Sequence, residues 1–336
     1  MDFGGIPSPP AQWRSFNIGQ WLREAGLEWF GLNLQLNAYA VFILLGIGAA
    51  LWVSNRRLVA RGAEPWVVLD VALWAVPLGI LGGRLYHVIT HPADYFYEGA
   101  NLLRVVYVWE GGLAIFGAIT LGAVGAFIGT RRSGLRFGAY VDALAPGLLI
   151  AQAVGRMGNY VNQELFGAPT ALPWGLQIDR PNAAIPVGLP AETLFHPTFA
   201  YEMIWNLLGA AVLIWVGRRF ALQWGRLLGL YLVWYGVGRA FLETLRLDPA
   251  ELLLGIRVNI WGSLAAIALG VIILVVQGRR HPGSEPGAYR FGQEWVPEPG
   301  VHSEEDYFVV TDESSSGDDE SAEPPATSQP VRSPSS

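Results

Sequence analysis

The stretch LNAYAVFILLGIGAALWV, residues 36–53, is an apolar run that is nearly long enough to cross a lipid bilayer. Six similar runs follow it along the chain, at residues 66–81, 112–128, 140–154, 199–216, 227–242 and 260–276. Several are shorter than the roughly 20 residues of a perpendicular membrane helix. We expect their ends to extend into neighbouring Trp and Tyr residues, which favour the membrane interface. The sequence therefore predicts an all-α polytopic membrane protein with about seven transmembrane helices.

The composition agrees with a membrane protein. Hydrophobic residues make up 52% of the 336 residues and charged residues only 15%, whereas soluble domains carry about 25% charged residues. Cysteine is absent, which excludes disulfides, thiolate metal sites and a cysteine nucleophile supplied by this chain.

The placement of arginine predicts the orientation. Arginines follow the first, third, fifth and seventh runs: Arg56, Arg57 and Arg61, then Arg131, Arg132 and Arg136, then Arg218, Arg219 and Arg226, then Arg279 and Arg280. By the positive-inside rule these loops are cytoplasmic, so the N-terminus lies outside and the C-terminus inside. The opposite segments, 82–111, 155–198 and 243–259, are longer. We expect the functional face to be extracytoplasmic.

Three parts are predicted along the chain. Residues 1–35 form an extracytoplasmic N-terminal segment, and residues 36–280 form a seven-helix transmembrane domain that carries the candidate site. Residues 281–336 hold 12 acidic and 2 basic residues with few aliphatic ones, and they predict a disordered acidic tail in the cytoplasm.

The motif GRMGNYVNQELFG, residues 155–167, is the first candidate site. It places Arg156, Asn159 and Glu164 directly after an apolar run, where polar groups are unfavourable without partners. An arginine at a helix end often only extends its charged head to water. The surrounding carboxamides and carboxylate favour a functional role instead, and the planar fork of arginine suits phosphate.

A second cluster follows in the sixth run. Tyr235, Arg239, Glu243 and Arg246 are spaced to lie along one face of a helix. Taken alone, the cluster is explained by a structural pair between Arg239 and Glu243. Beside the first arginine cluster, a shared anionic ligand becomes an equal alternative.

Other polar residues give weaker signals. Asp142 and Asp70 lie in apolar runs and favour structural pairing with an arginine. Arg84 ends the second run, and His196 is either a proton-transfer group or a structural histidine. His87 and His91 are accompanied by no obvious metal ligands. The sequence lacks a phosphate-binding loop, an H-E-x-x-H motif, a G-x-S-x-G elbow and a clustered D-x-x-D pattern, which favours a mechanism without a metal.

The pattern G-R-x-G-N-x-x-N-x-E-x-x-G closely resembles the signature of prolipoprotein diacylglyceryl transferases, and the resemblance covers about residues 30 to 280. Supporting matches are Gly82-Gly83-Arg84, Trp109-Glu110-Gly111-Gly112-Leu113, His196-Pro197-Thr198 with Tyr201-Glu202, and Gly238-Arg239 through Glu243. The resemblance implies transfer of a diacylglyceryl group from phosphatidylglycerol to the lipobox cysteine of a preprolipoprotein, with release of glycerol phosphate. It also implies a bacterial plasma-membrane enzyme without cofactor and without nucleic acid as a partner.

The resemblance assigns roles to individual residues. Arg156, Asn159, Glu164 and Gly167 match functional positions of the signature, Arg239 and Glu243 match a second essential pair, Tyr235 matches a proposed catalytic tyrosine, and Tyr39 and Asp142 match further polar positions. On this basis we expect catalytic roles for Arg156, Arg239, Tyr235 and Glu243. We expect phosphatidylglycerol to contact Arg156, Asn159, Glu164, Gly167, Tyr39, Asp142, Arg84 and His196.

One position departs from the resemblance. Some members carry a histidine, proposed as the base, in the third run where this chain has Phe116. The thiol must lose its proton to become a nucleophile. Tyr235 and His196 are therefore the two candidate bases. A transporter or channel, and a different lipid-modifying transferase, remain the alternatives to this function.

Overall fold

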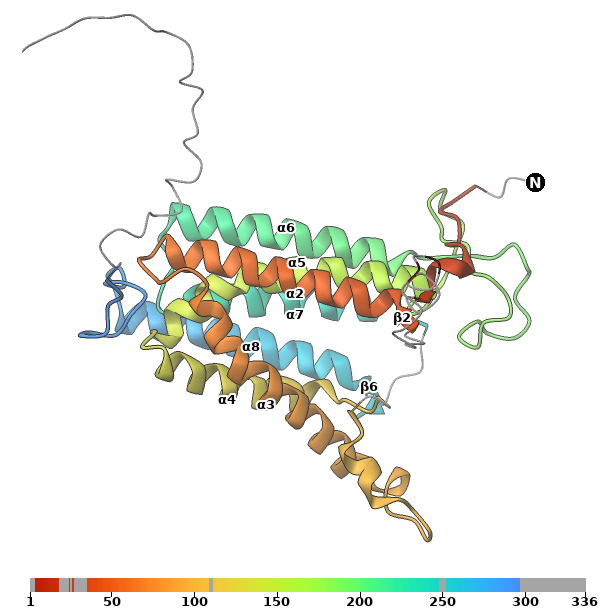
Figure 1. The fold of residues 1–336 in the computed structure, drawn as a ribbon. Coiled ribbons are helices and arrows are strands. Elements are labelled where there is room, and N and C mark those ends of the chain that lie inside the picture. Colours follow the sequence, from red (N-terminus) through yellow and green to blue (C-terminus); the bar gives the residue numbers. More distant parts are fainter. Residues whose placement is uncertain are drawn as a thin grey trace, which may run out of the picture. The chain divides into compact units, whose positions relative to one another are not determined.

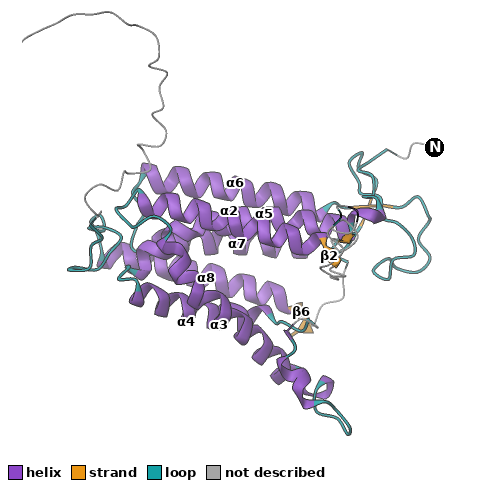
Figure 2. Ribbon diagram, in the orientation of Figure 1, coloured by secondary structure: helices purple, strands orange, loops and turns teal. Residues whose placement is uncertain are grey.

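Seven α-helices form most of the described part of the computed structural model, which covers residues 4–17, 24, 26, 35–108, 111–247 and 252–296. Each helix contains one of the predicted apolar runs or most of it (Figures 1 and 2). The helices are α2 (Ala38–Val59), α3 (Val67–Thr90), α4 (Ile115–Arg132), α5 (Phe137–Asn162), α6 (Thr198–Arg219), α7 (Arg226–Glu243) and α8 (Val258–Arg280). The prediction of a mainly helical protein is confirmed.

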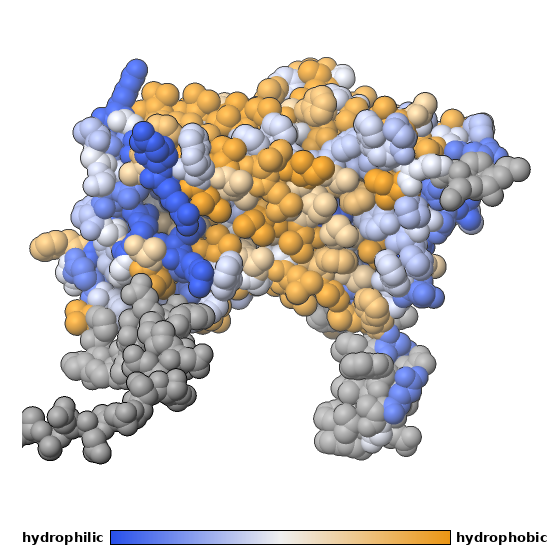
Figure 3. All heavy atoms as spheres, turned by 90° about the horizontal axis from the view of Figure 1, so that it is seen from above, coloured by the Kyte–Doolittle hydropathy of each residue, from blue (hydrophilic) through white to orange (hydrophobic). Residues whose placement is uncertain are grey.

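Five of these helices, α2, α3, α5, α6 and α8, are long and apolar enough to cross a membrane. The 18 residues of α7 include Arg226, Arg239 and Glu243, and α4 ends in two arginines. Large apolar side chains are exposed on the helices, among them Leu44, Leu73 and Ile272. Figure 3 shows an apolar band over the middle of the helices, with hydrophilic residues toward both ends. Lipid tails can cover such a band without the unfavourable exposure that water would cause.

Helix α5 is the most buried of the five, with 56% of its apolar window inside the protein. It packs against α2 and against α6 and α7, while α8 packs on α7 (Figure 1). One buried cluster joins α5, α6 and α7 and contains Ala145, Leu149, Ala210, Leu213, Leu227 and Tyr231. Functional residues at the ends of α5, α6 and α7 are thus held by one shared core.

Helices α3 and α4 form a tight hairpin. A Cβ atom added to Gly82 would lie 2.3 Å from the carbonyl oxygen of Gly117, and one added to Gly117 would lie 2.1 Å from that of Gly82. Small residues let two membrane helices approach to backbone contact.

The other elements are short: η1 (Ala11–Trp13), η3 (Pro92–Asp94), η4 (Leu102–Val106), and the antiparallel pairs β1 (Ser15–Asn17) with β2 (Gln35–Asn37), β3 (Pro169–Thr170) with β4 (Leu194–Phe195), and β5 (Leu252–Leu253) with β6 (Ile256–Arg257).

Residues 285–289 of the predicted tail belong to the folded core. Ala288 and Tyr289 are buried in a core cluster with residues of α2, α3, α4 and α5, and Glu285 forms an ion pair with Arg61. The prediction of disorder from residue 281 was wrong for this stretch. It rested on the acidic composition averaged over residues 281–336, which does not reveal that Ala288 and Tyr289 pack into the core. The remainder of the predicted tail, 297–336, lies outside the described residues.

The N-terminal segment packs on the segment that follows α5. Ile6 forms a parallel bridge with Leu176. The carboxylate of Asp179 accepts hydrogen bonds from Ser8 Oγ at 2.6 Å and from Gln163 Nε2 at 2.7 Å, and it lies 3.7 Å from Arg14. These bonds, above all that from Ser8, hold the pKa of Asp179 below its usual range.

Acid should therefore weaken the attachment of the N-terminal segment, which backbone hydrogen bonds of Ile6 also hold. Because the folded pKa of Asp179 is depressed, its contribution is complete above the unfolded value of about 3.9 and is lost as the pH falls through the folded value. The chain has no cysteine, so a dye on Gly4→Cys reports this segment alone. We expect the fluorescence anisotropy of this dye to decrease when the pH is lowered below about 4. In Asp179→Asn this acid transition should be absent, and an identical acid transition in both proteins would contradict the assignment.

Candidate active site

The signature motif folds back on the end of α5. The helix ends at Gln163, whose backbone is left-handed with φ 54°, and the chain then reverses so that Glu164 N–H reaches the carbonyl of Asn159 at 3.1 Å. Asn159 accepts a hydrogen bond from Arg156 Nη1 at 2.9 Å and donates one to Glu164 Oε1 at 2.8 Å. The predicted grouping of these three residues is present, with Asn159 holding the other two.

Helix α6 adds a carboxylate between the two arginine clusters. Glu202, one turn into α6, is 6% exposed and forms an ion pair with Arg156. Its other oxygen lies 3.6 Å from Arg239 Nη1 of α7. One buried carboxylate thus brings together two guanidinium groups that are far apart in the sequence.

The charges continue to the start of α8. Arg239 Nη2 lies 3.0 Å from Glu243 Oε2, and the other oxygen of Glu243 accepts from Arg257 Nη1 at 3.1 Å and from Asn259 Nδ2 at 3.0 Å. Glu243 is 1% exposed. We call the alternating series that it completes the arginine–glutamate chain: Arg156, Glu202, Arg239, Glu243 and Arg257.

The arginine–glutamate chain is suited to an anionic ligand. Its three arginines exceed its two glutamates by one charge. The side chains of Arg156 and Arg239 retain 21% and 15% of their exposure, and each guanidinium has five N–H donors to distribute. A phosphate that reaches both would gain charge-assisted bonds in a partly dehydrated environment, where such bonds are strong.

Two predicted tyrosines lie near this chain. Tyr39, in the first turn of α2, places its ring against Gly158, where an added Cβ would come within 2.4 Å of Tyr39 Cδ2. Tyr235 lies one turn before Arg239 on α7 and stacks on Tyr231, with ring centroids 6.0 Å apart. Tyr39 thus lies beside the signature motif and Tyr235 lies one turn from Arg239, while their roles in binding and catalysis stay predictions.

Gly167 and His196 lie together at the edge of the site. The N–H of Gly167 donates to the carbonyl of His196 at 2.9 Å, and a Cβ on Gly167 would lie 2.8 Å from that of His196. His196 Nδ1 is 3.2 Å from the hydroxyl of Tyr201. Gly167 thus allows the backbone to pack closely against His196, and the imidazole of His196 is hydrogen-bonded to the hydroxyl of Tyr201 in α6.

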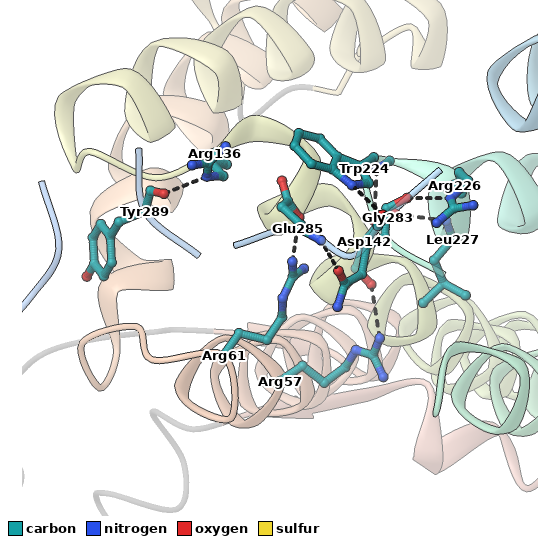
Figure 4. Close-up of polar contacts among 12 residues, drawn as sticks. Arg57, Arg61, Arg136, Asp142, Trp224, Arg226, Leu227, Gly283, Glu285 and Tyr289 are labelled. Atoms are coloured by element: carbon teal, nitrogen blue, oxygen red, sulfur yellow. Dashed lines mark hydrogen bonds and ion pairs between the residues drawn. The ribbon is translucent and has the colours of Figure 1, made fainter. Parts of the chain in front are cut away.

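Asp142 lies away from the other predicted site residues. It is 17 residues before Asn159 on α5, about 25 Å along the helix. Its carboxylate accepts hydrogen bonds from the N–H groups of Gly225 at 2.8 Å, Leu227 at 2.8 Å and Leu228 at 3.1 Å. Figure 4 shows Asp142 beside Leu227 at the start of α7. These N–H groups are the orphan donors of a helix N-terminus. The structure separates Asp142 from the arginine–glutamate chain and gives it a capping role.

Arg84 is likewise engaged elsewhere. It is 5% exposed and donates to the carbonyls of Val105 at 2.7 Å and Gly111 at 2.6 Å, and also to that of Arg104. Its guanidinium lies over the Tyr95 ring. The residue therefore organises the loop between α3 and α4, where it lines a pocket of about 370 Å³. Phe116 is 45% exposed and lies near Tyr86 on the same hairpin.

Arg257 and Asn259, which contact Glu243, were not predicted from the sequence, and Glu202 was not predicted to have a central place in the site. Glu202 entered only as part of a motif match, although its place one turn into a helix, after a histidine and a proline, was visible. Arg257 and Asn259 carried no signal, because the short β5–β6 turn that brings them to Glu243 follows no pattern that periodicity detects.

Comparison with known proteins identifies the family of the chain. The family model described as prolipoprotein diacylglyceryl transferase matches residues 28–276, which is most of the chain. The chain belongs to the prolipoprotein diacylglyceryl transferase family. All residues of the arginine–glutamate chain lie inside the matched range, and the family predicted from the signature is confirmed.

Individual members of the family are close in sequence. The phosphatidylglycerol–prolipoprotein diacylglyceryl transferase of Leifsonia xyli is 56% identical over 298 residues, covering 87% of this chain and 86% of the relative. The second such transferase of Streptomyces coelicolor is 49% identical over 285 residues, covering 85% and 84%. That of Mycobacterium tuberculosis is 46% identical over 274 residues, covering 77% of this chain and 58% of the relative.

Proposed function

We propose that the chain transfers the diacylglyceryl group of phosphatidylglycerol to the lipobox cysteine of preprolipoproteins. The cysteine thiol loses its proton, and its sulfur attacks the glyceryl carbon next to the phosphate. A sulfur–carbon bond forms while the carbon–oxygen bond breaks, and the electron pair departs with glycerol phosphate. The observation that carries the proposal is the pairing of Arg156 and Arg239 on the single carboxylate of Glu202.

Each member of the site then has a role. Arg156 and Arg239 bind the phosphate and stabilise the charge that develops on its oxygen as the bond breaks. Glu202 sets the spacing of the two guanidiniums, and Glu243 orients Arg239. Asn159 accepts a hydrogen bond from Arg156, and Glu164 accepts one from Asn159. These two bonds orient the guanidinium group of Arg156 toward the ligand.

The membrane setting supports the same function. We infer that all seven helices cross the bacterial plasma membrane, with the N-terminus outside and the C-terminus in the cytoplasm. Basic residues occupy the last turns of α2, α4, α6 and α8, as cytoplasmic ends require. The arginine–glutamate chain joins the end of α5 to the start of α6, at the other face. Donor lipid of the outer leaflet and an exported peptide both have access to that face.

Two residues, Tyr235 and His196, are the candidates for the base that removes the thiol proton. Tyr235 shares a face of α7 with Arg239, whereas His196 lies at the edge of the site with Nδ1 near Tyr201. Positive charge comes from the guanidinium groups, so the mechanism needs no cofactor and no metal. Transfer should accordingly continue in the presence of EDTA.

A detergent assay of the purified protein tests the function. Phosphatidylglycerol and a lipobox peptide should yield a lipid-modified peptide and one equivalent of glycerol phosphate, and a peptide with Cys→Ser should yield neither. Product formed from phosphatidylethanolamine but not from phosphatidylglycerol would indicate a different lipid transferase. A folded protein that modifies no peptide but moves lipid or ions across vesicles would indicate a transporter.

The separation of Asp142 from the site gives a further prediction. Asp142→Ala removes three charge-assisted bonds to the start of α7 and should lower the free energy of unfolding by about 2–3 kcal/mol. The KM for phosphatidylglycerol of the variant that remains folded should be unchanged. Thermal unfolding in detergent measures the change in stability, and a phosphatidylglycerol titration measures the KM. A raised KM at unchanged stability would show that Asp142 belongs to the lipid-binding site.

A further inference from the structure

One buried side-chain carbonyl, about one helical turn before Arg156 on α5, has no hydrogen-bond partner. Within the part of the chain that the structure describes, Gln152 Oε1 is buried and unpaired. Its amide nitrogen donates to the hydroxyl of Tyr231 at 2.9 Å, which holds the side chain in place. An unsatisfied buried acceptor is unfavourable in the free protein, and few are found in native structures. Such an atom is accounted for if a ligand supplies the donor.

The position of Gln152 relates it to the arginines. It lies four residues before Arg156 on α5, on the same helical face and about 6 Å closer to the membrane interior. Tyr231 lies eight residues before Arg239 on α7 and stacks on Tyr235. Beyond this layer begins the apolar core, where Leu149 and Leu213 are fully buried. Gln152 is therefore the last polar side chain below the proposed phosphate site on this face of α5.

The chemistry of the proposed transfer requires a donor at that depth. With the phosphate on Arg156 and Arg239, the acyl chains extend toward the membrane interior, and the attacked carbon lies on the inner side of the phosphate. In an in-line displacement the sulfur approaches from the side opposite the departing oxygen, about 3–3.5 Å from the carbon. We expect that point to lie deeper than the arginines, near the level of Gln152 and Tyr235, which are each about one turn before an arginine of the site. A diacylglyceryl lipid has only ester acceptors at this depth, whereas the thiol brings an S–H donor.

We propose that Gln152 Oε1 accepts the hydrogen bond of the lipobox thiol and positions its sulfur for attack. This assignment rests on the proposed function and adds the residue that binds the nucleophile. The amide holds the thiol while it is protonated, and Tyr231 fixes the amide with its oxygen turned toward the substrate. Proton removal then falls to the base described above.

Two unreactive peptides test the assignment. In one the lipobox cysteine is replaced by serine, which keeps a donor, and in the other by 2-aminobutyrate, which has a methyl group instead. Each is used as a competitive inhibitor of transfer to the cysteine peptide. The native enzyme should bind the serine peptide about fivefold more tightly than the aminobutyrate peptide, since one hydrogen bond differs. In Gln152→Met this ratio should fall to about one.

The chain offers a matched control. Gln277 of α8 also has a buried, unpaired Oε1, and it lies near the opposite end of that helix from Asn259. Gln277→Met should keep the native ratio. A ratio near one in the native enzyme, or an unchanged preference in Gln152→Met, would overturn the thiol assignment while transfer itself continues. A native ratio near one overturns the assignment even if Gln152→Met does not fold, and Gln152→Leu then serves as a second variant for the loss of the ratio. Absence of native transfer would instead overturn the proposed function.

Discussion

Arg156→Ala should lower kcat/KM for phosphatidylglycerol by about a hundred- to a thousandfold, the loss expected when one group that stabilises a departing oxyanion is removed. The substitution removes both the bond to Asn159 and the ion pair with Glu202, so the remaining carboxylate is also left to compete with the phosphate for Arg239. Initial rates over a range of lipid concentrations in detergent, with equal amounts of folded protein, measure the effect.

Two companion variants separate charge from geometry. Arg156→Lys keeps the charge but replaces a planar fork by a point charge, and it should recover only a small part of the activity. Arg218→Ala, at the other end of α6 and exposed, should behave as the native protein. Near-native activity of Arg156→Ala would remove this residue from the phosphate site, whatever the lysine variant does.

Glu243→Ala is expected to destabilise the protein more than any other single change at the site. Its carboxylate is 1% exposed and pairs with Arg239 and Arg257 while accepting from Asn259. Removing one partner of a buried ion pair leaves uncompensated charge, which typically lowers the free energy of unfolding by about 3–5 kcal/mol. Activity should fall with it, because Arg239 loses the group that orients it.

Thermal unfolding in detergent measures this loss, and Glu164→Ala is the matched control. Glu164 is an exposed glutamate of the same site that is held by one bond to Asn159, and its removal should change stability by less than about 1 kcal/mol. Equal melting temperatures of the Glu243 and Glu164 variants would contradict the proposed burial of charge at the end of α7.

The helical fold followed from the sequence because hydrocarbon imposes a strong and local rule. A bilayer accepts only long apolar segments whose backbone bonds are satisfied internally, so each apolar run predicts one helix without knowledge of its neighbours. The local motif was equally informative: Arg156, Asn159 and Glu164 lie within nine residues, and a single helix end brings them together.

The roles of single charged residues did not follow so directly. Asp142 and Arg239 are both charges within apolar runs, and the family resemblance assigned both to the site. The structure separates them, because the partners of Asp142 are amides of the α6–α7 turn and of the start of α7, whereas those of Arg239 are carboxylates of α6 and α7. Arg84 was similarly misleading, since the carbonyls that bind it lie 20 to 27 residues further along the chain.

By itself the sequence determined the helices, the family and the local group of Arg156, Asn159 and Glu164, since these depend on local composition and on a contiguous signature. The second predicted cluster is only partly on one helix, because α7 ends at Glu243, before Arg246. Only the tertiary structure decided which charges meet. Glu202 joins Arg156 to Arg239, Arg257 reaches Glu243, and residues 285–289 return to the core. Electrostatic pairing acts over a few ångströms of space, and the packing of helices, not the distance along the chain, determines which side chains come that close.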